Sequence, residues 1–364
     1  MLTIARRHDP TTTVDLSIQG ANNGGGQIRV KDGVDKIDTA LLPVARLYLR
    51  FRKNVGKTVS YIAVLCILLG VVFTAPAMAQ GAGPNINFLT PVGLKTTTIS
   101  YLDSESNFRL GQSDFGELDI QTRTSSLNFF YRFGLLDRLA MLGFTLSHVD
   151  INARAFAGGP EPALLLTGGV TGFSDPVLSF RMGLVGTPAL QGQAWRDYTQ
   201  GFQLSVQVNW ILPYGDYDAS RLLNPGFNRH AVDLVFPMVL PIDGARRTTF
   251  LEVTPQARFF GNNNEPFGLA AELEQDPLYI GEIQILHHIT GRWWTAVGAQ
   301  YQNGGATFAD GQPRDSALDQ WFGEIALGVI VNRRLSLAAT YGSILGDANG
   351  AEGEAWRLKL GLIL

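Results

Sequence analysis

The sequence predicts an all-β protein, a closed antiparallel transmembrane β-barrel of about twelve strands that is preceded by a cleaved signal peptide. Three observations predict this fold. Apolar and polar side chains alternate along most segments after Gln80, which is the period of a strand with two different faces. No segment after Gln80 approaches the roughly 20 apolar residues of a membrane-spanning helix. Short connections alternate with long ones, as in the barrels of bacterial outer membranes.

Residues 55–79 have the layout of a secretory signal peptide. A cationic stretch precedes an apolar run over residues 61–73, and the small residues that follow predict cleavage after Ala79. The run is shorter than a spanning helix, which disfavours a membrane anchor. The single cysteine, Cys66, lies within this run, so a disulfide framework is excluded.

Residues 1–54 contain the Gly/Asn-rich stretch QGANNGGGQ and are predicted to be either a disordered extension or a segment upstream of the true translation start. Of the 29 Lys and Arg residues, 10 fall in residues 1–79, against 5 of the 32 Asp and Glu residues. The rest of the chain therefore carries 19 cationic and 27 anionic side chains. This acidic balance argues against nucleic acid as a partner, because phosphate contacts need clustered cations.

Residues 80–92 begin the mature chain and are rich in glycine and proline, so we expect an N-terminal segment that could fold into the barrel as a plug. The barrel itself is predicted over residues 93–364. Its expected strands, in order, lie near 95–102, 126–133, 139–148, 176–184, 202–210, 232–240, 250–260, 279–289, 293–302, 321–331, 335–345 and 354–364.

A soluble sandwich would also alternate, so the choice of a barrel depends on strand length and on aromatic residues. Many of the segments have the 9 to 11 residues of a tilted membrane crossing, whereas soluble strands average about 5 or 6. Aromatic residues gather near the strand ends, where barrels place them at the membrane interfaces. They are Phe133, Trp210, Tyr214, Phe259, Trp293, Tyr301, Trp321, Tyr341 and Trp356.

The connections predict which side each end faces. Short turns such as GLLDR and VNRR are expected on the periplasmic side, and long loops near 103–122, 150–172, 214–229, 261–276, 303–319 and 343–353 on the outside. Residues 186–200 are an exception, because this connection is long where a short one is due. Pro237 and Pro255 each remove a ladder donor, so we expect a bulge or a strand end at each.

If the apolar faces meet lipid, the polar faces line the lumen. The predicted lumen-lining residues are Arg181, Gln203, Ser205, Gln207, Asn209, Asp233, Glu252, Thr254, Gln256, Arg258, Glu282, Gln284, Gln300, Glu324, Arg357 and Lys359. They could form a structural network that closes the barrel, or a polar channel whose selectivity they tune.

Several short motifs resemble the MetA-pathway-of-phenol-degradation family of outer-membrane barrels. They are a Gly-x-x-Asp-Pro element, a Pro-x-Gly-x-Tyr element, an Asn-x-Gly element and a Tyr-x-x-Gly-Gly element. The matching residues are Gly172, Asp175, Pro176, Pro213, Gly215, Tyr217, Asn224, Gly226, Tyr301, Gly304 and Gly305. The resemblance implies a channel-like or transporter-like protein that accompanies the catabolism of aromatic compounds.

Enzymatic chemistry finds little support in the sequence. None of the histidines is followed two residues later by the serine of a barrel phospholipase, and His148 with Asp150 lacks an evident nucleophile. The adjacent His287 and His288 would face opposite sides of a strand, so they form no metal pattern. No catalytic residue, cofactor or metal ligand is therefore assigned, and the protein is expected not to be an enzyme.

The function predicted from these observations is passive uptake of small, aromatic or hydrophobic solutes across a Gram-negative outer membrane. The expected partners are outer-membrane lipid, such a solute, and the barrel-assembly machinery during biogenesis. Two alternatives stay open, an outer-membrane lipid or ester hydrolase and a structural or adhesion barrel with acidic external loops.

Overall fold

The computed structural model of the protein describes residues 2–5, 13–19, 27–30, 84–109, 115–157, 164–314, 316–347 and 351–364. The chain divides into two compact units, residues 1–63 and 64–364. In the first unit, β1 (Leu2–Ala5), β2 (Thr13–Gln19) and β3 (Gln27–Val30) form an antiparallel sheet in that order. The expected signal peptide, residues 55–79, and residues 80–83 lie outside the described residues.

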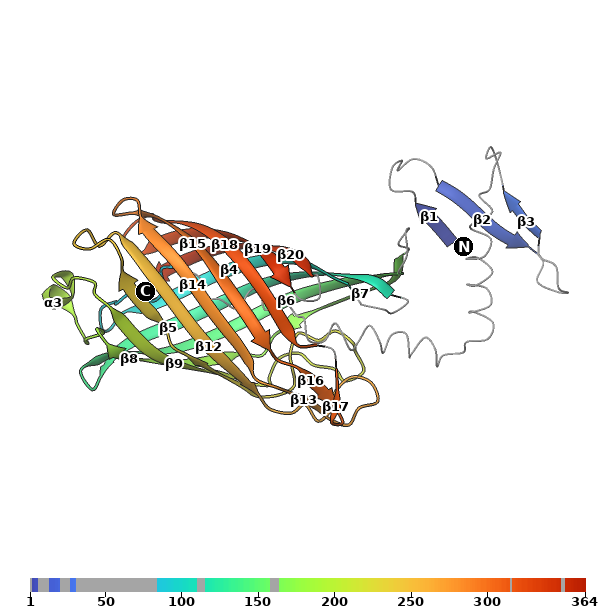
Figure 1. The fold of residues 1–364 in the computed structure, drawn as a ribbon, viewed down its shortest axis with the longest axis horizontal. Helices are drawn as coiled ribbons and strands as arrows, with labels where there is room; N and C mark the ends of the chain where they lie inside the picture. Colours follow the sequence, from blue (N-terminus) through green and yellow to red (C-terminus); the bar gives the residue numbers. More distant parts are fainter. Residues whose placement is uncertain are drawn as a thin grey trace. The chain divides into compact units, whose positions relative to one another are not determined.

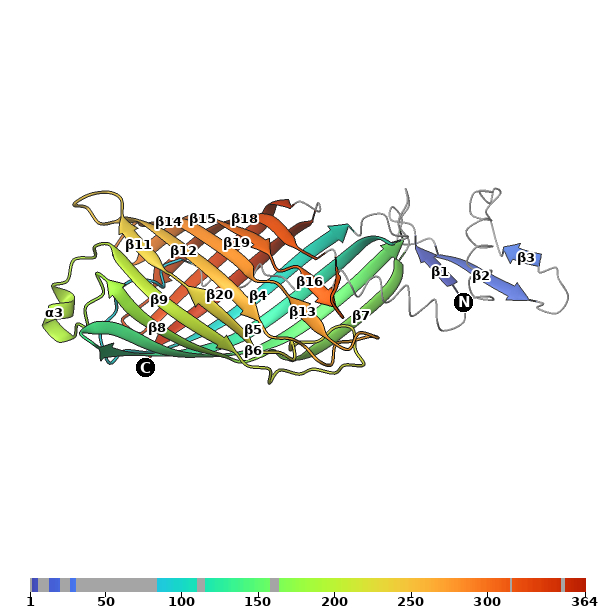
Figure 2. The ribbon, with the colours of Figure 1, turned by 60° about the horizontal axis from the view of Figure 1, so that its bottom comes forward.

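The second unit is a closed antiparallel barrel (Figures 1 and 2). Its strands are β4 (Lys95–Arg109), β5 (Phe115–Leu135), β6 (Arg138–Ala157), β7 (Leu164–Phe173), β8 (Val177–Val185), β9 (Gln203–Ile211), β10 (Ala231–Val235), β11 (Met238–Pro241), β12 (Thr249–Phe260), β14 (Leu278–His288), β15 (Trp293–Gly304), β18 (Leu318–Ile330), β19 (Leu335–Asp347) and β20 (Glu352–Ile363).

These fourteen strands make twelve crossings, because β7 with β8 and β10 with β11 are halves of interrupted crossings. Both β7 and β8 pair with β6, and both β10 and β11 pair with β9 and β12. The last strand, β20, pairs with the first, β4, which closes the barrel. The predicted fold class and strand number are confirmed.

One of the two predicted proline irregularities is present and the other is wrong. Pro237 lies in the gap between β10 and β11, as expected. Pro255 lies inside β12, opposite Gly281 of β14 in an unbroken register. A regular strand is possible at Pro255 because the N–H that proline lacks would not face β14. The Pro255 carbonyl accepts from the Phe236 amide at 2.9 Å. The carbonyl and the N–H of a strand residue face the same neighbouring strand, so the missing N–H faces the interruption beside Pro237.

Three strands are much longer than a membrane crossing needs, which corrects the predicted outer loops 103–122 and 150–172. β4, β5 and β6 contain 15, 21 and 20 residues, against about 9 to 11 for a crossing. Their outer halves form a regular ladder, with Ser104 opposite Thr122 and Thr122 opposite Ile151. Only residues 110–114 and 158–163 of the expected loops fall outside the described residues.

The remaining connections follow the predicted asymmetry. The tight turns at 136–137, 242–248, 289–292 and 331–334 lie at one end, and the C-terminus lies at the same end (Figure 1). The long 186–202 connection, also at this end, contains the helix α3 (Gly192–Arg196). The long loops of the other end carry a small sheet of β13 (Leu273–Gln275), β16 (Thr307–Ala309) and β17 (Gln312–Pro313). None of the described helices has the length and apolarity to cross a membrane.

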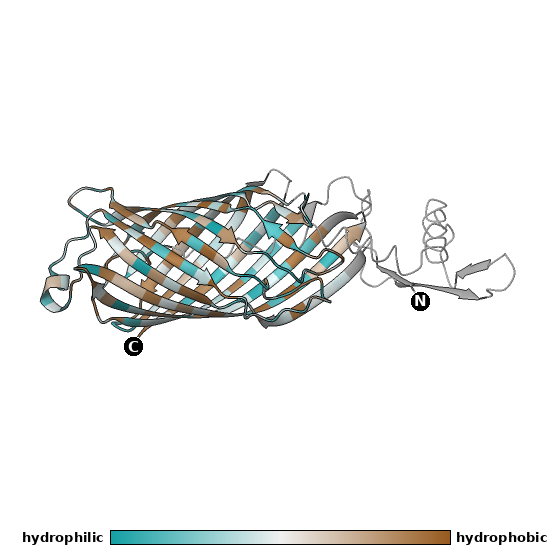
Figure 3. Ribbon diagram, turned by 90° about the horizontal axis from the view of Figure 1, so that it is seen from below, coloured by the Kyte–Doolittle hydropathy of each residue, from teal (hydrophilic) through white to brown (hydrophobic). Residues whose placement is uncertain are grey.

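Hydrophobic and hydrophilic residues alternate along the barrel strands (Figure 3), and many large apolar side chains are exposed on the outside. On β14, Ile283 and Ile285 are each 46% exposed, whereas Gln284 between them is 2% exposed. At the rim, Tyr301 stacks on Trp321 with ring centroids 4.7 Å apart, and Tyr341 lies 4.5 Å from Trp356. An exposed apolar band with aromatic pairs at its edge is what a lipid environment stabilises.

The polarity reverses in the outer halves of β4, β5 and β6. There the outward positions are mostly polar, and the inward positions combine apolar residues with the buried Ser104, Ser106 and Thr122. Leu118, Ile120, Ala153 and Ala155 are buried together, and Leu223 of the β9–β10 loop packs against them. We call these five residues the apolar mouth. Outside them, Arg123 forms an ion pair with Asp103 at 3.3 Å. Sequence reading assigned this region to loops because the polar and apolar faces exchange sides there.

Candidate functional site: the barrel lumen

The predicted lumen-lining residues all lie on the face of their strands opposite the exposed apolar side chains. The buried members are Gln203, Asp233, Glu252, Arg258, Gln284 and Arg357, and the other ten are half-buried. Several inward polar residues are missing from the predicted set. They include Arg132, Ser179, Gln302, Gln320 and Thr340. The same strand alternation identifies them, since each keeps the parity of its lumen-facing neighbours.

A buried ion pair joins two neighbouring strands on one side of the lumen. Arg258 of β12 donates through Nε to Asp233 Oδ1 at 2.5 Å and through Nη2 to Oδ2 at 2.9 Å. Asn209 of β9 donates to Asp233 Oδ2 at 3.3 Å. The two-point geometry satisfies both carboxylate oxygens, which is what a buried charge pair needs.

On the neighbouring strand β14, Gln284 connects two acidic side chains. It donates to Glu282 and also to Glu324 Oε1, at 2.6 Å for the latter. A ladder of glutamines continues toward the outside, because Gln320 donates to Gln302 at 2.9 Å and Gln302 donates to Gln300 at 2.7 Å. We call the inward polar residues between the two apolar ends of the lumen the polar band.

The N-terminal segment, residues 84–94, contacts the inner face of the barrel. The Asn85 amide donates to Glu252 Oε1 at 3.1 Å, and Asn87 Nδ2 donates to Glu252 Oε2 at 2.9 Å. Phe88 lies edge-to-face on Phe250, with ring centroids 4.9 Å apart and an interplanar angle of 88°. Backbone bonds tie the rest of the segment down, including one from the Gly93 amide to the Arg132 carbonyl at 2.9 Å.

Phe88 belongs to an apolar cluster at the periplasmic end of the lumen, which we call the apolar base. Its other members are Val239, Phe250, Leu286, Trp294, Ala296, Ala326 and Ala338. Gly328 allows the Trp294 ring to lie flat against β18, since a Cβ at Gly328 would be 2.1 Å from Trp294 Cε2. Sequence reading did not identify this cluster, because its members come from six neighbouring strands and the N-terminal segment, and the register of these strands brings them together.

Several of the family-motif residues gather at the outer rim, around Asp175 between β7 and β8. Asp175 Oδ1 accepts from the Gly215 amide at 2.9 Å, and Oδ2 accepts from the Phe227 amide at 2.7 Å. A Cβ at Gly215 or at Gly226 would lie within 3.0 Å of Asp175 Oδ1, so glycine is required at both. Burial raises the pKa of Asp175, although the two amides act in the other direction. Asp175 thereby fixes the β9–β10 loop to the wall.

Further contacts extend this rim network to the next loops. Tyr217 donates to the Glu265 carbonyl at 2.7 Å and accepts from Asn263 Nδ2 at 3.1 Å. Gln275 donates to the Gly305 carbonyl at 2.9 Å. The positive φ angles of Gly304 and Gly305, +96° and +72°, suit glycine at the end of β15. The motif residues therefore hold the outer loops in place. Pro213 and Tyr301 lie outside these contacts, Tyr301 in the aromatic rim.

The candidate catalytic groups lie away from the lumen. His148 is exposed on the outer face of β6, with Nε2 3.4 Å from Thr171 Oγ1 and its ring 5.4 Å from that of Phe173. Within the described part of the chain, no group of three or more His, Cys, Asp or Glu side chains is arranged to hold a metal ion.

The chain is similar to known outer-membrane proteins. The family model described as "Putative MetA-pathway of phenol degradation" matches residues 101–360. The COG4313 outer membrane channel from Pseudomonas putida F1 is 20% identical, with a TM-score of 0.61 over 78% of this chain and 99% of that chain. The transport unit of the autotransporter AIDA-I from Escherichia coli is 8% identical, with a TM-score of 0.46 over 83% and 97%. No curated protein matches the chain.

Proposed function

The chain belongs to this phenol-degradation family of outer-membrane β-barrels, and on that premise we propose that it is a passive channel for small apolar or aromatic solutes. The similar protein from Pseudomonas putida F1 carries the description of an outer membrane channel, which supports the proposal. The observation that carries it is the order of surfaces along the lumen. The apolar mouth comes first, the polar band follows, and the apolar base lies at the periplasmic end.

The apolar mouth makes the outer end of the lumen apolar. Its four strand residues are buried beneath Leu223 of the β9–β10 loop, so an apolar solute would reach them by displacing that side chain. Such a displacement replaces one apolar contact by another and exposes little apolar area to water. Many side chains of the polar band already bond one another, as in the pair of Asp233 with Arg258 and in the bonds of Gln284 to two glutamates. A solute passing these groups does not leave them newly unpaired. This arrangement suits solutes with a compact apolar body.

We further propose that the N-terminal segment is the plug of this channel. Its bonds to Glu252 and the contact of Phe88 with Phe250, both on the inner face of the barrel, support this proposal. Its anchors are hydrogen bonds and the aromatic contacts of Phe88 with Phe250 and His288. Displacing such a segment is an accessible local opening rather than an unfolding of the barrel.

Deletion of residues 84–91 tests the plug. Single-channel conductance in planar bilayers is expected to rise severalfold relative to the full chain, since the lumen loses its obstruction. The double variant Asn87→Ala with Phe88→Ala removes two anchors and is expected to give transient openings to the higher level. An unchanged conductance in the deletion variant, with the barrel folded, would show that the lumen is closed by the polar band.

Uptake of radiolabelled benzyl alcohol by intact cells, at a concentration where the outer membrane limits entry, tests the channel. Cells that contain the full chain should take it up several times faster than cells without it, and a protonophore should leave the rate of entry unchanged. Equal rates with and without folded barrel in the outer membrane would contradict transport. The same cells report on the hydrolase alternative, because ester turnover lost in His148→Ala would favour it.

A further inference from the structure

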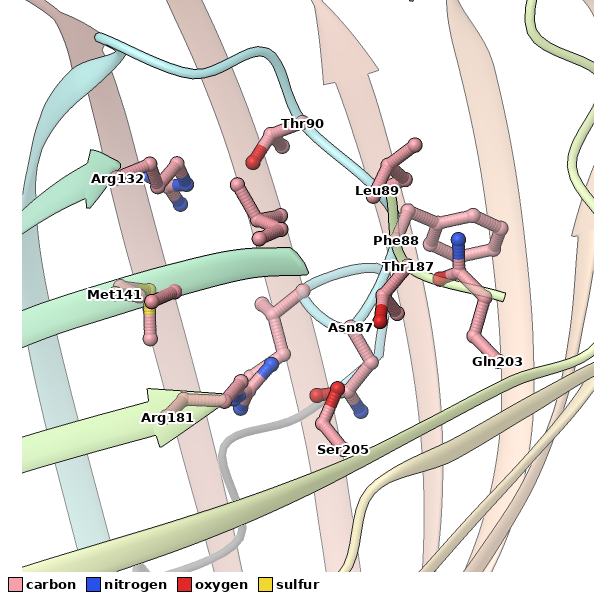
Figure 4. A pocket seen from close by; sticks show the side chains of 13 residues that line it. Asn87, Phe88, Leu89, Thr90, Arg132, Met141, Arg181, Thr187, Gln203 and Ser205 are labelled. Atoms are coloured by element: carbon pink, nitrogen blue, oxygen red, sulfur yellow. The ribbon is translucent and has the colours of Figure 1, made fainter. Parts of the chain in front are cut away.

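Two arginines face the same part of the lumen from strands on either side of β6. Arg132 of β5 pairs in register with Met141 of β6, and Met141 pairs with Arg181 of β8. The three residues form one inward row, in which the two arginine backbones are two strand spacings, about 10 Å, apart. Figure 4 shows both guanidinium groups directed toward the N-terminal segment.

Both arginines have only neutral hydrogen-bond partners. Arg132 Nη1 donates to Thr96 Oγ1 at 2.7 Å, and Arg181 Nε donates to Gln207 Oε1 at 2.6 Å. Within the described ranges, neither has a carboxylate within ion-pair distance. A guanidinium has five N–H donors, so each arginine keeps donors for a further acceptor.

The nearby carboxylates are already engaged. Asp233 is paired with Arg258, and Glu252 accepts from the N-terminal segment through both oxygens. Glu252 attracts Arg181 through space but is not its ion-pair partner. The two guanidinium groups together carry more positive charge than this one carboxylate offsets, which raises the free energy of the empty site. An anion that bridges them would remove that cost, and a carboxylate has the planar two-oxygen geometry that guanidinium groups bind best.

The residues around the two arginines indicate the chemistry of the part of the ligand that carries the carboxylate. They line a cavity together with Met141, Leu89 and Thr187 (Figure 4). Thr187 is 4% exposed and its hydroxyl has no hydrogen-bond partner, so it can donate to an acceptor in the cavity. Arg132 also lies 6.0 Å from the centroid of the inward Phe130 ring. The cavity thus combines cationic donors with apolar and aromatic surface.

We propose that Arg132 and Arg181 bind the carboxylate of small aromatic acids within the lumen, with the ring of the ligand against Met141 and Leu89. This inference rests on the proposed channel function and narrows its substrate class to organic monoanions with an apolar body. The N-terminal segment forms one side of the site, so a bound acid competes for the space that Leu89 occupies. Entry of the acid therefore favours displacement of the segment.

Calorimetric titration of the purified full chain in detergent micelles, with sodium benzoate as the probe, tests the site. Arg132→Gln and Arg181→Gln should each weaken benzoate binding by roughly 10-fold or more, since each loses charged hydrogen bonds. Arg196→Gln, which removes an exposed arginine of α3 outside the lumen, is the matched control and should bind benzoate like the full chain. Arg132→Lys and Arg181→Lys, which keep the charge, should lie between, and they replace the Gln variants if those fail to fold.

Two further probes separate this inference from the proposed function. Cells carrying the Gln variants should lose benzoate uptake in greater proportion than benzyl alcohol uptake, whereas cells carrying Arg196→Gln should take up both probes like cells carrying the full chain. If benzoate binds but neither probe enters cells, the channel fails and the site stands. If benzyl alcohol enters and benzoate binding survives both Gln substitutions, the site is wrong. Inorganic phosphate that binds as tightly as benzoate would also overturn it, because the apolar surface would then contribute nothing.

Discussion

The pair of Asp233 and Arg258 shows how single residues stabilise the barrel from inside. Both side chains are buried, at 5% and 8% exposure, and their contact spans β10 and β12. β10 has only five residues before the interruption at Pro237, so its backbone ladder is short. The charge pair therefore adds a side-chain connection between β10 and β12, where there are few backbone hydrogen bonds.

Removing one member of this pair should destabilise the barrel strongly. We expect Asp233→Ala to lower the free energy of unfolding by about 3 kcal/mol, because it leaves the Arg258 charge uncompensated. The double variant Asp233→Leu with Arg258→Met should cost much less than the single one, since no unpaired charge remains. Guanidinium unfolding in lipid vesicles measures both. Equal costs would show that the pair acts through packing alone.

On β14, lipid-facing residues alternate with lumen-facing residues. Placing an arginine at each of two adjacent positions tests this alternation. Ile283→Arg places a cation against lipid and should lower the free energy of unfolding by about 2 to 4 kcal/mol. Gln284→Arg places the same cation between Glu282 and Glu324, so its cost should be well below that of Ile283→Arg. Unfolding in vesicles compares the two. A similar cost at both positions would contradict a lipid-facing Ile283.

At the scale of elements, the β11–β12 turn at residues 242–248 depends on one carboxylate. Asp243 Oδ2 accepts from the Thr248 hydroxyl at 2.6 Å and from the amides of Thr248 and Thr249 at 2.9 and 3.1 Å. These bonds, led by that of the Thr248 side chain, lower the pKa of Asp243 to about 2. The stability of this turn therefore depends on pH in the acid range.

The direction of that response follows from the lowered pKa. The ionised carboxylate stabilises the folded turn at pH values above about 4, and the stabilisation is lost as the pH falls from about 4 to 2. We expect the Thr248 and Thr249 amide resonances to shift over that window in an NMR titration. Asp243→Asn should remove the shift, and a midpoint at pH 4 in the full chain would contradict the hydrogen-bonded turn.

The elements also show where sequence reading succeeds. Strands such as β9 and β14 are predicted well because one face meets apolar lipid and the other a polar lumen, so the sequence alternates sharply. The outer parts of β4, β5 and β6 escape prediction because polar residues replace apolar ones on the outer face, as at Asp103 and Arg123. Regular backbone pairing continues in these outer parts, but the alternation of apolar outward and polar inward residues that predicts a membrane strand is absent.

At the scale of the whole molecule, strand parity predicts which side chains face the lumen but not which of them meet. Arg132 and Arg181 are 49 positions apart in the chain, and only the register of β5, β6 and β8 brings them into one row. The apolar base depends likewise on the register of six neighbouring strands, and the rim network on three separate loops. Contacts of this kind are set by register and closure, which composition and periodicity do not determine.

The long outer sheet has a consequence for the environment in which the mouth opens. At about 3.4 Å per residue, the 21 residues of β5 span roughly 70 Å, and a tilt of about 45° leaves a height near 50 Å. This is about twice the 25 Å of the apolar band. The outer end of this strand thus stands roughly 25 Å beyond the apolar band, so the mouth opens into the water outside the membrane and not at the membrane surface.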